Sequence, residues 1–237
     1  ENISMDVIDL KNENQSIIHV CQGLFQYSNS LIKCSVEKTF RDKVRNNHTA
    51  THLMHKALKN ILGNHVNQAG SLVHPDYLRF DLTHFEKITE EQIEKIEKMV
   101  NSQILANTKL DVSIESYDDA KNQGAEALFG EKYGNEVRVV KVGEYSMELC
   151  GGTHVNRTGD IGTFKIIEES SLSSGVRRIV ALTGTGALKE VQKNSSIIHS
   201  LQQKFNVPSS EIINKVNTLI NEKKDLEKKI KQRSFGN

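Results

Sequence analysis

Apolar residues recur at helical spacing in one long stretch of the chain, at Ala50, Leu53, Met54, Ala57, Leu58, Ile61 and Leu62. This period of 3.6 residues predicts an amphipathic helix from about Arg45, which Gly63-Asn64 would end. At about 100° per residue, His48 and His52 lie one turn apart and away from the apolar stripe. The pattern therefore predicts a helix with two histidines on a face that is not the core face.

Short alternating patterns before this helix predict strands. In the first 42 residues they lie at Ile3–Ile8, Ile17–Cys21 and Leu31–Val36, and a polar turn separates the first two at Lys11–Gln15. Cys21 and Cys34 are interpreted as small packing residues in these strands.

After the histidine helix, strand and helix patterns alternate. Apolar spacing and turn residues predict two strands between Val66 and Phe80 around a turn at His74–Asp76, and then a helix that begins at Thr89–Gln92. A strand at Val112–Glu115, a short helix from Asp118 and a strand at Val137–Val142 follow. Two further strands, at Ile161–Glu168 and Val176–Leu182, are predicted on either side of a polar loop at Glu169–Ser171.

The pattern from Thr185 to the end is helical and is divided at Pro208. Five apolar positions in its last part fit a 4-3 repeat with Lys223 at one core position, namely Ile212, Val216, Leu219, Leu226 and Ile230. This favours the beginning of a coiled coil. The basic residues between Lys223 and Arg233 suit either a solvated helix face or contact with RNA phosphates.

Composition narrows the possible classes of protein further. The 237 residues suffice for one large or two small domains, and 31 basic against 30 acidic residues give a net charge of +1. Bulk charge thus does not indicate nucleic acid, and any RNA contact must be local. No apolar run approaches the roughly 18 residues of a membrane span, and no signal peptide is visible. Three cysteines make no disulfide framework, so we expect a reducing, cytoplasmic location. A start without Met and a charged helical end suggest a piece of a longer protein.

Cys150 and His154 repeat the four-residue spacing of the histidine pair, but Gly151 and Gly152 between them predict a tight loop. Three imidazoles and a thiolate form a tetrahedral set that suits Zn²⁺. His55 shares the face of His48 and His52, and spacing does not exclude it as a ligand. Spacing also leaves open that the histidines are merely solvated and that the two pairs never meet.

Several other functional classes lack their required residues. A zincin needs Glu after the first histidine, where Thr49 stands, and a nucleobase deaminase needs His-x-Glu with Cys-x-x-Cys. No Walker loop is present, since Gly184-Thr185-Gly186 is too short to cradle a nucleotide.

Seven stretches in one register, from about Arg45 to Lys189, resemble the editing domain of alanyl-tRNA synthetases. They are Asn47–Leu53, Gln68–Val73, Leu78–Asp81, Gly124–Tyr133, Leu149–His154, Arg157–Gly162 and Gly175–Ile179. The resemblance implies an α+β fold, an antiparallel sheet with packed helices, over residues 43–189. Residues 1–42 would be a remnant of the β-barrel that precedes this domain, without its glycine-rich earlier strands. Residues 190–237 would be a helical arm that begins a coiled coil.

The resemblance also implies an activity, which is hydrolysis of serine, or glycine, from mischarged tRNA(Ala). The zinc ligands would be His48, His52, Cys150 and His154. The partner would be the acceptor end of tRNA(Ala), with no DNA or membrane, and the helical arm is a candidate dimer contact. Full members of the family join alanine to tRNA(Ala) with ATP, through an adenylate-forming domain that this chain does not contain.

The resemblance also implies roles for two further residues. Thr51 would face the amino-acid pocket and recognise the serine hydroxyl, and Gln68 would position the water or the ester. Glu148 is the nearest acid to Cys150 and a candidate base or partner of a ligand. Arg177 and Arg178 are candidates for phosphate contact, although strand alternation would aim only one at the site.

The role of the zinc stays open between activating a water, polarising the carbonyl and organising the pocket. Because four permanent ligands would leave no position for water, we expect one ligand, Cys150 in our hypothesis, to be exchangeable. Two alternatives remain, a free-standing trans-editing deacylase and a non-catalytic tRNA-binding module stabilised by zinc.

Overall fold

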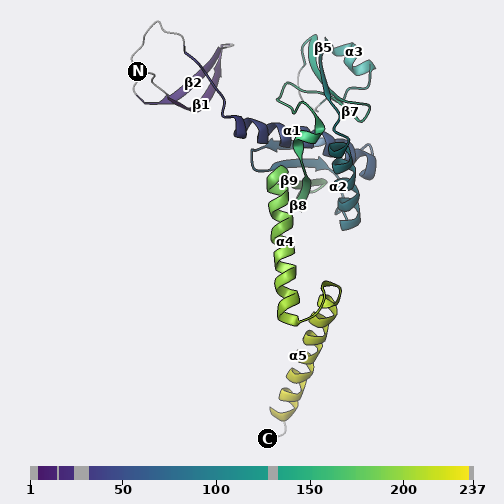
Figure 1. The fold of residues 1–237 in the computed structure, drawn as a ribbon. Helices are drawn as coiled ribbons and strands as arrows, with labels where there is room; N and C mark the ends of the chain where they lie inside the picture. The colour runs from purple at the N-terminus through teal and green to yellow at the C-terminus, as the bar shows by residue number, and fades with distance from the viewer. Residues whose placement is uncertain (1–4, 15, 24–31, 128–132, 235–237) are drawn as a thin grey trace. The chain divides into compact units, whose positions relative to one another are not determined.

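The computed structural model describes residues 5–14, 16–23, 32–127 and 133–234. Contacts divide the chain into two compact units, Glu1–Val36 and Glu37–Asn237. In the first, β1 (Asp6–Glu13) and β2 (Ser16–Gln22) form an antiparallel hairpin (Figure 1).

The first unit corrects three expectations. Strand β1 continues to Glu13, so the turn is shorter than predicted; Gln15, like Ile3, lies outside the described residues. The strand expected at Leu31–Val36 is wrong, because residues 32–36 form none and Leu31 is not described. The packing role of Cys21 and Cys34 is also wrong, since both are exposed. A hairpin of two strands buries neither face by itself, so cysteines on it or beside it find no core.

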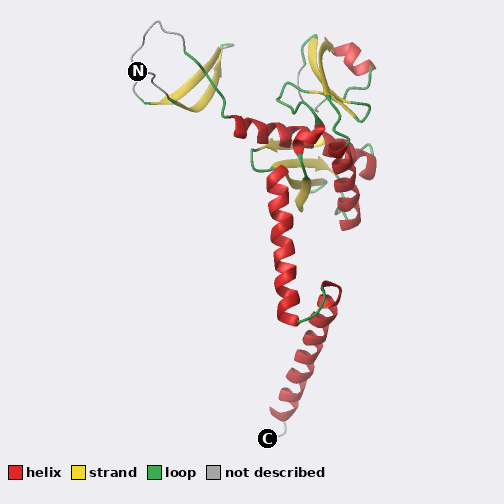
Figure 2. Cartoon of the chain, in the orientation of Figure 1, coloured by secondary structure: helices red, strands yellow, loops and turns green. Residues whose placement is uncertain are grey.

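The second unit is α+β, and its strands pair antiparallel in two sheets (Figure 2). One sheet has the order β3-β4-β9-β8, and the other has the order β5-β6-β7. The strands are β3 (Gln68–Val73), β4 (Leu78–Thr83), β5 (Leu110–Ser116), β6 (Glu136–Val142), β7 (Ser146–Leu149), β8 (Phe164–Ser173) and β9 (Val176–Thr183). The helices are α1 (Lys38–Leu62), α2 (Glu90–Leu105), α3 (Tyr117–Asn122), α4 (Gly184–Phe205) and α5 (Ile212–Ser234), with 3-10 turns at Thr158–Ile161 and Ser209–Glu211.

Helix α1 carries the predicted apolar stripe into the core. Its residues from Ala50 to Leu58 on that stripe are completely buried, and the helix packs on α2 and on strands β3, β4 and β9. The carboxylate of Glu37 caps its start by accepting from the backbone N–H groups of Thr39 and Phe40. The predicted stop is confirmed, since Gly63 adopts a φ of 115° and its N–H donates to the carbonyl of Lys59.

Other predicted elements are confirmed with shifted ends. The β3–β4 hairpin turns at residues 74–77, and Thr89 with Gln92 forms a capping box at the start of α2. The polar loop predicted at Glu169–Ser171 is wrong, because β8 continues through it to Ser173. The chain instead reverses at Gly175, where φ is 74°, a value that few residues other than glycine adopt easily.

Strand β6 contributes buried residues from both of its faces. Val140 and Val142 join the core cluster of α1, whereas Val137 and Val139 join a second cluster with Leu149 of β7. Since neighbouring residues of a strand point to opposite faces, β6 separates the two cores. It also fixes the position of β7 and of the loop that follows it.

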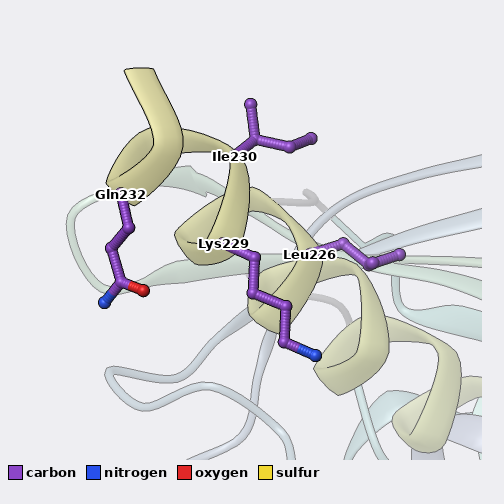
Figure 3. A pocket seen from close by; sticks show the side chains of 4 residues that line it. All are labelled: Leu226, Lys229, Ile230 and Gln232. Atoms are coloured by element: carbon purple, nitrogen blue, oxygen red, sulfur yellow. The ribbon is translucent and has the colours of Figure 1, made fainter. Parts of the chain in front are cut away.

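The last two helices are separated at Asn206, a left-handed residue with φ 52°, and by the 3-10 turn after Pro208. Of the predicted 4-3 repeat, Ile212 is buried, while Leu226 and Ile230 are 58% and 63% exposed. Figure 3 shows Leu226, Lys229, Ile230 and Gln232, which line a hollow formed by α5 alone. Within the described part of the chain, no helix is long and apolar enough to traverse a lipid bilayer.

Candidate metal centre

Four side chains from two distant segments converge in the second unit. His48, His52, Cys150 and His154 each offer one ligand atom, and these atoms all lie within 4.8 Å of one another. The Cys150 Sγ is 3.4 Å from the Nε2 of His48 and 3.4 Å from the Nε2 of His154. Two ligands at ordinary Zn–N and Zn–S bond lengths in a tetrahedron are separated by about 3.6 Å. The spacing therefore fits a zinc-sized cation.

Each pair is placed by a different kind of local structure. His48 and His52 come from successive turns of α1, and Cys150 follows directly after β7. The rings of His48 and His154 stack with centroids 4.2 Å apart, and the ring of His52 stands edge-on at 4.6 Å from His154. The prediction that the two pairs meet is confirmed.

His52 and His154 are buried and His48 is half-buried, so the alternative of merely solvated histidines is wrong. His52 is 6% exposed and His154 is 9% exposed. The histidine face of α1 is separate from its apolar stripe, but the loop from Cys150 to His154 and strand β7 cover it. Periodicity identifies the apolar side of a helix, whereas it cannot reveal a polar cover from a segment far along the chain.

Backbone and hydroxyl partners fix the orientation of two of the rings. The Nδ1 of His48 lies 3.2 Å from the carbonyl oxygen of Thr153, to which it can only donate. The Nδ1 of His154 lies 3.1 Å from the Oγ1 of Thr49, which also accepts from the N–H of Val155 at 3.2 Å. A proton on Nδ1 leaves the Nε2 lone pair for a metal, which is the tautomer that a ligand needs.

A carboxylate orients the third ring. The Oε2 of Glu148 lies 3.3 Å from the Nδ1 of His52, and its Oε1 lies 3.3 Å from the Nδ1 of His55. Glu148 is 6% exposed, so this bridge is buried. His55 lies outside the group of four, which answers the question that its spacing left open.

The loop itself is held by a residue that the sequence analysis missed. The Arg138 Nη1 donates to the carbonyl oxygens of Cys150 and Gly152, at 2.7 Å each. Arg138 lies in β6, and its own carbonyl accepts from the N–H of Cys150 at 2.9 Å. The one local indication was an arginine inside a run of valines.

Burial keeps the imidazoles neutral. Burial, together with the nearby His52, lowers the pKa of His48 to about 4. Burial, with charge repulsion from His52 and His48, lowers the pKa of His154 to about 2. The pKa of His52 is also lowered, chiefly by burial. Neutral imidazoles are the form in which histidine binds a metal.

The other residues expected at the site make different contacts. Thr51 is buried in α1, and its hydroxyl donates to the carbonyl of Asn47 at 2.8 Å. Gln68 begins β3, and its amide donates to the hydroxyl of Ser71 at 3.3 Å.

Both candidate arginines of β9 are paired with carboxylates. Arg178 donates from Nε and Nη2 to the two oxygens of Asp81, at 2.7 and 2.9 Å. The Arg177 Nε donates to Glu169 at 2.6 Å. Their charges are therefore paired with carboxylates within the fold.

A family model described as the threonyl and alanyl tRNA synthetase second additional domain matches residues 137–180. The matched part runs from β6 to β9 and includes Cys150 and His154. Of the stretches in the resemblance, only residues 128–132 lie outside the described residues.

Curated relatives match almost the entire chain. A protein named alanine–tRNA ligase from Acetivibrio thermocellus is 45% identical over 236 residues, which is 98% of this chain and 27% of the relative. Its namesakes from Alkaliphilus oremlandii and Fervidobacterium nodosum are 46% and 48% identical, over 97% and 86% of this chain and 26% and 24% of their own lengths. The chain thus spans about a quarter of the length of these relatives, and it belongs to the alanyl-tRNA synthetase family.

Proposed function

We propose that residues 43–189 form an editing site that hydrolyses Ser-tRNA(Ala), and Gly-tRNA(Ala) in the same way, within a longer alanine–tRNA ligase. The observation that carries this proposal is the convergence of three imidazoles and one thiol on a single point. The name of the relatives supplies the substrate class, since an alanine–tRNA ligase handles aminoacylated tRNA(Ala).

The residues fit Zn²⁺ by number, type and orientation. The Nδ1 atoms of all three histidines already have partners in the protein, and Cys150 supplies a soft ligand. A bound Zn²⁺ would act as a Lewis acid toward the ester carbonyl or toward a water. We place the exchangeable position at Cys150, because Arg138 holds the backbone carbonyls of Cys150 and Gly152 and would keep the loop in shape if the thiolate left the metal.

Glu148 acts as an orienting group in this proposal. Both of its oxygens face imidazole nitrogens, so neither is directed at a substrate. It keeps the proton on the Nδ1 of His52 and leaves the opposite nitrogen for the metal.

Thr51 and Gln68 would serve the substrate. Because the Thr51 hydroxyl donates its proton to the Asn47 carbonyl, its remaining lone pairs would accept from the hydroxyl of serine. Alanine lacks that hydroxyl and would lose the contact, which is the discrimination that editing requires. The Gln68 amide would position the water or the ester.

The remaining parts would serve RNA binding and assembly. Arg177 and Arg178 would contact phosphates of the acceptor end through the N–H groups that their carboxylates leave over. Residues 1–42 would belong to a β-barrel, and residues 190–237 would begin a coiled-coil arm that joins two subunits.

The test measures ester hydrolysis and metal content together. The chain should release serine from Ser-tRNA(Ala) much faster than alanine from Ala-tRNA(Ala). Cys150→Ala should lose metal and activity, whereas Gln68→Ala should lose activity and keep the metal. A chain that binds zinc but slows loss of serine from the tRNA would be a binding module, and that result would refute the proposed hydrolysis.

A further inference from the structure

His55 stands one turn beyond His52 on α1 and is buried, with 6% exposure. Its Nδ1 lies 3.3 Å from the Oε1 of Glu148, while the other oxygen of that carboxylate lies 3.3 Å from the Nδ1 of His52. A single carboxylate thus spans two histidines of the same helix, and only one of them belongs to the metal group.

The other edge of His55 has no comparable partner. Its Nε2 is buried and makes no hydrogen bond with the described residues, and its ring lies 5.3 Å from that of Phe80. A buried polar atom without a partner costs about 1–3 kcal/mol. An apolar side chain would fill this place against Phe80 without that cost, so packing alone does not explain a histidine here.

We propose that His55 is a positioning residue that acts through Glu148 on His52 and thereby raises the affinity of the site for a divalent cation. The inference rests on the proposed metal site and extends it by one residue. With an N–H donor on each oxygen, the carboxylate plane of Glu148 is held from both sides. Without His55, one buried oxygen loses its donor and the carboxylate can rotate away from His52.

The size of the effect follows from what such partners contribute elsewhere. Loss of a group that directly orients a metal ligand commonly weakens binding by about 10–100-fold. Because His55 acts one step further out, we expect about tenfold, the lower end of that range.

Two substitutions separate the hydrogen bond from the shape of the ring. His55→Asn places an amide N–H near the former Nδ1 and should keep the metal affinity within about threefold of the wild-type value. That change is smaller than the loss of affinity expected when an orienting partner is removed. His55→Leu removes the donor and should weaken Zn²⁺ and Co²⁺ binding about tenfold. Affinity is measured by competition with a chromophoric chelator, and the visible absorption of bound Co²⁺ reports the coordination. If His55→Leu fails to fold, His55→Gln, with its amide N–H near the former Nε2, takes its place.

A double-mutant cycle shows whether the effect passes through Glu148. In a Glu148→Gln background, His55→Leu should change the affinity much less than it does in the wild type. Equal affinities for His55→Leu and His55→Asn would overturn the proposal, and so would an undiminished effect in the Glu148→Gln background. A wild-type chain that binds no metal would be a different result, because it would refute the metal site itself.

Discussion

Gly152 lies so close to His48 that a Cβ at position 152 would stand 2.1 Å from the Cε1 of the imidazole. Real Cβ atoms essentially never approach another atom to under 3.0 Å. At Gly151 an added Cβ would meet nothing within 4 Å, and neither glycine is among those with positive φ. Glycine is therefore required at position 152 for space, and the ligand loop contacts α1 through its backbone.

The first prediction concerns this contact. Gly152→Ala should displace His48 or the loop and weaken binding of Zn²⁺ or Co²⁺ by at least about tenfold, as loss of ligand orientation does elsewhere. Gly151→Ala is the matched control and should leave the affinity unchanged. Competition titration of both variants checks this, and equal losses would show that the loop does not contact His48 as described.

The second prediction concerns Arg138. Arg138→Met removes the donor to the Cys150 and Gly152 carbonyls and should lower the free energy of unfolding by about 1.5–3 kcal/mol, the range for hydrogen bonds to charged groups. Metal affinity should fall as well, because the loop loses its fixed shape. Urea denaturation with and without Zn²⁺ measures both effects. Arg138→Lys keeps one cationic donor group, so its free energy of unfolding should lie between those of the wild type and Arg138→Met. A wild-type free energy of unfolding for Arg138→Met would contradict the role of Arg138 in holding the loop.

The third prediction concerns pH and the metal-free chain. The folded-state pKa of His48 is about 4, below its unfolded value of about 6.5, so the unfolded chain binds more protons between these values. The contribution of His48 to the free energy of unfolding should therefore be complete above about pH 6.5, and the free energy of unfolding should fall as the pH drops toward 4. His154 acts in the same direction, since its pKa is about 2.

Each of these two histidines can contribute at most about 1.4 kcal/mol per pH unit in that window. Urea midpoints between pH 4.5 and 7.5 measure the slope, and His48→Asn should make it shallower. The same slope in both proteins would mean that His48 titrates normally in the folded chain.

The fourth prediction compares a partly buried and an exposed ion pair. Arg178→Met leaves Asp81, 4% exposed, with only the longer 3.5 Å contact to the Nε of Arg79 and should clearly destabilise the fold. Lys95→Met breaks the exposed pair with Glu91 and should change the stability little. Thermal or urea unfolding of both variants checks the difference. Destabilisation of similar size in the two would show that Asp81 is not buried in a dry environment.

Most of the helices and strands were predictable from local sequence pattern, since the apolar stripe of α1 and the capping box of α2 each depend on residues a few positions apart. The wrong predictions arose where the same residue types are compatible with two kinds of local structure. Three polar residues at Glu169–Ser171 suit a loop or an exposed stretch of strand, and cross-strand pairing, for example of Glu169 with Ile179, selected the strand. Cys21 and Cys34 were assigned to a core that the hairpin does not form by itself.

The group of four was predictable by residue type, and Glu148 was predictable as a partner of one of its histidines, whereas the other supporting contacts were not. Thr49, His55 and Arg138 reach the site through contacts with residues about 12 to more than 100 positions away. Such contacts depend on how the β6–β7 hairpin settles on α1, and no local period encodes that geometry.

His48 and Cys150 are 102 positions apart. In the unfolded chain a cation would meet one half of this set at a time, so the complete site exists only once the intervening strands have formed. A cation that binds there works as a removable cross-link across a long loop, and its release takes away a constraint whose entropy grows with the length of that loop. The concentration of free zinc would then set the stability of the fold as well as the occupancy of the site.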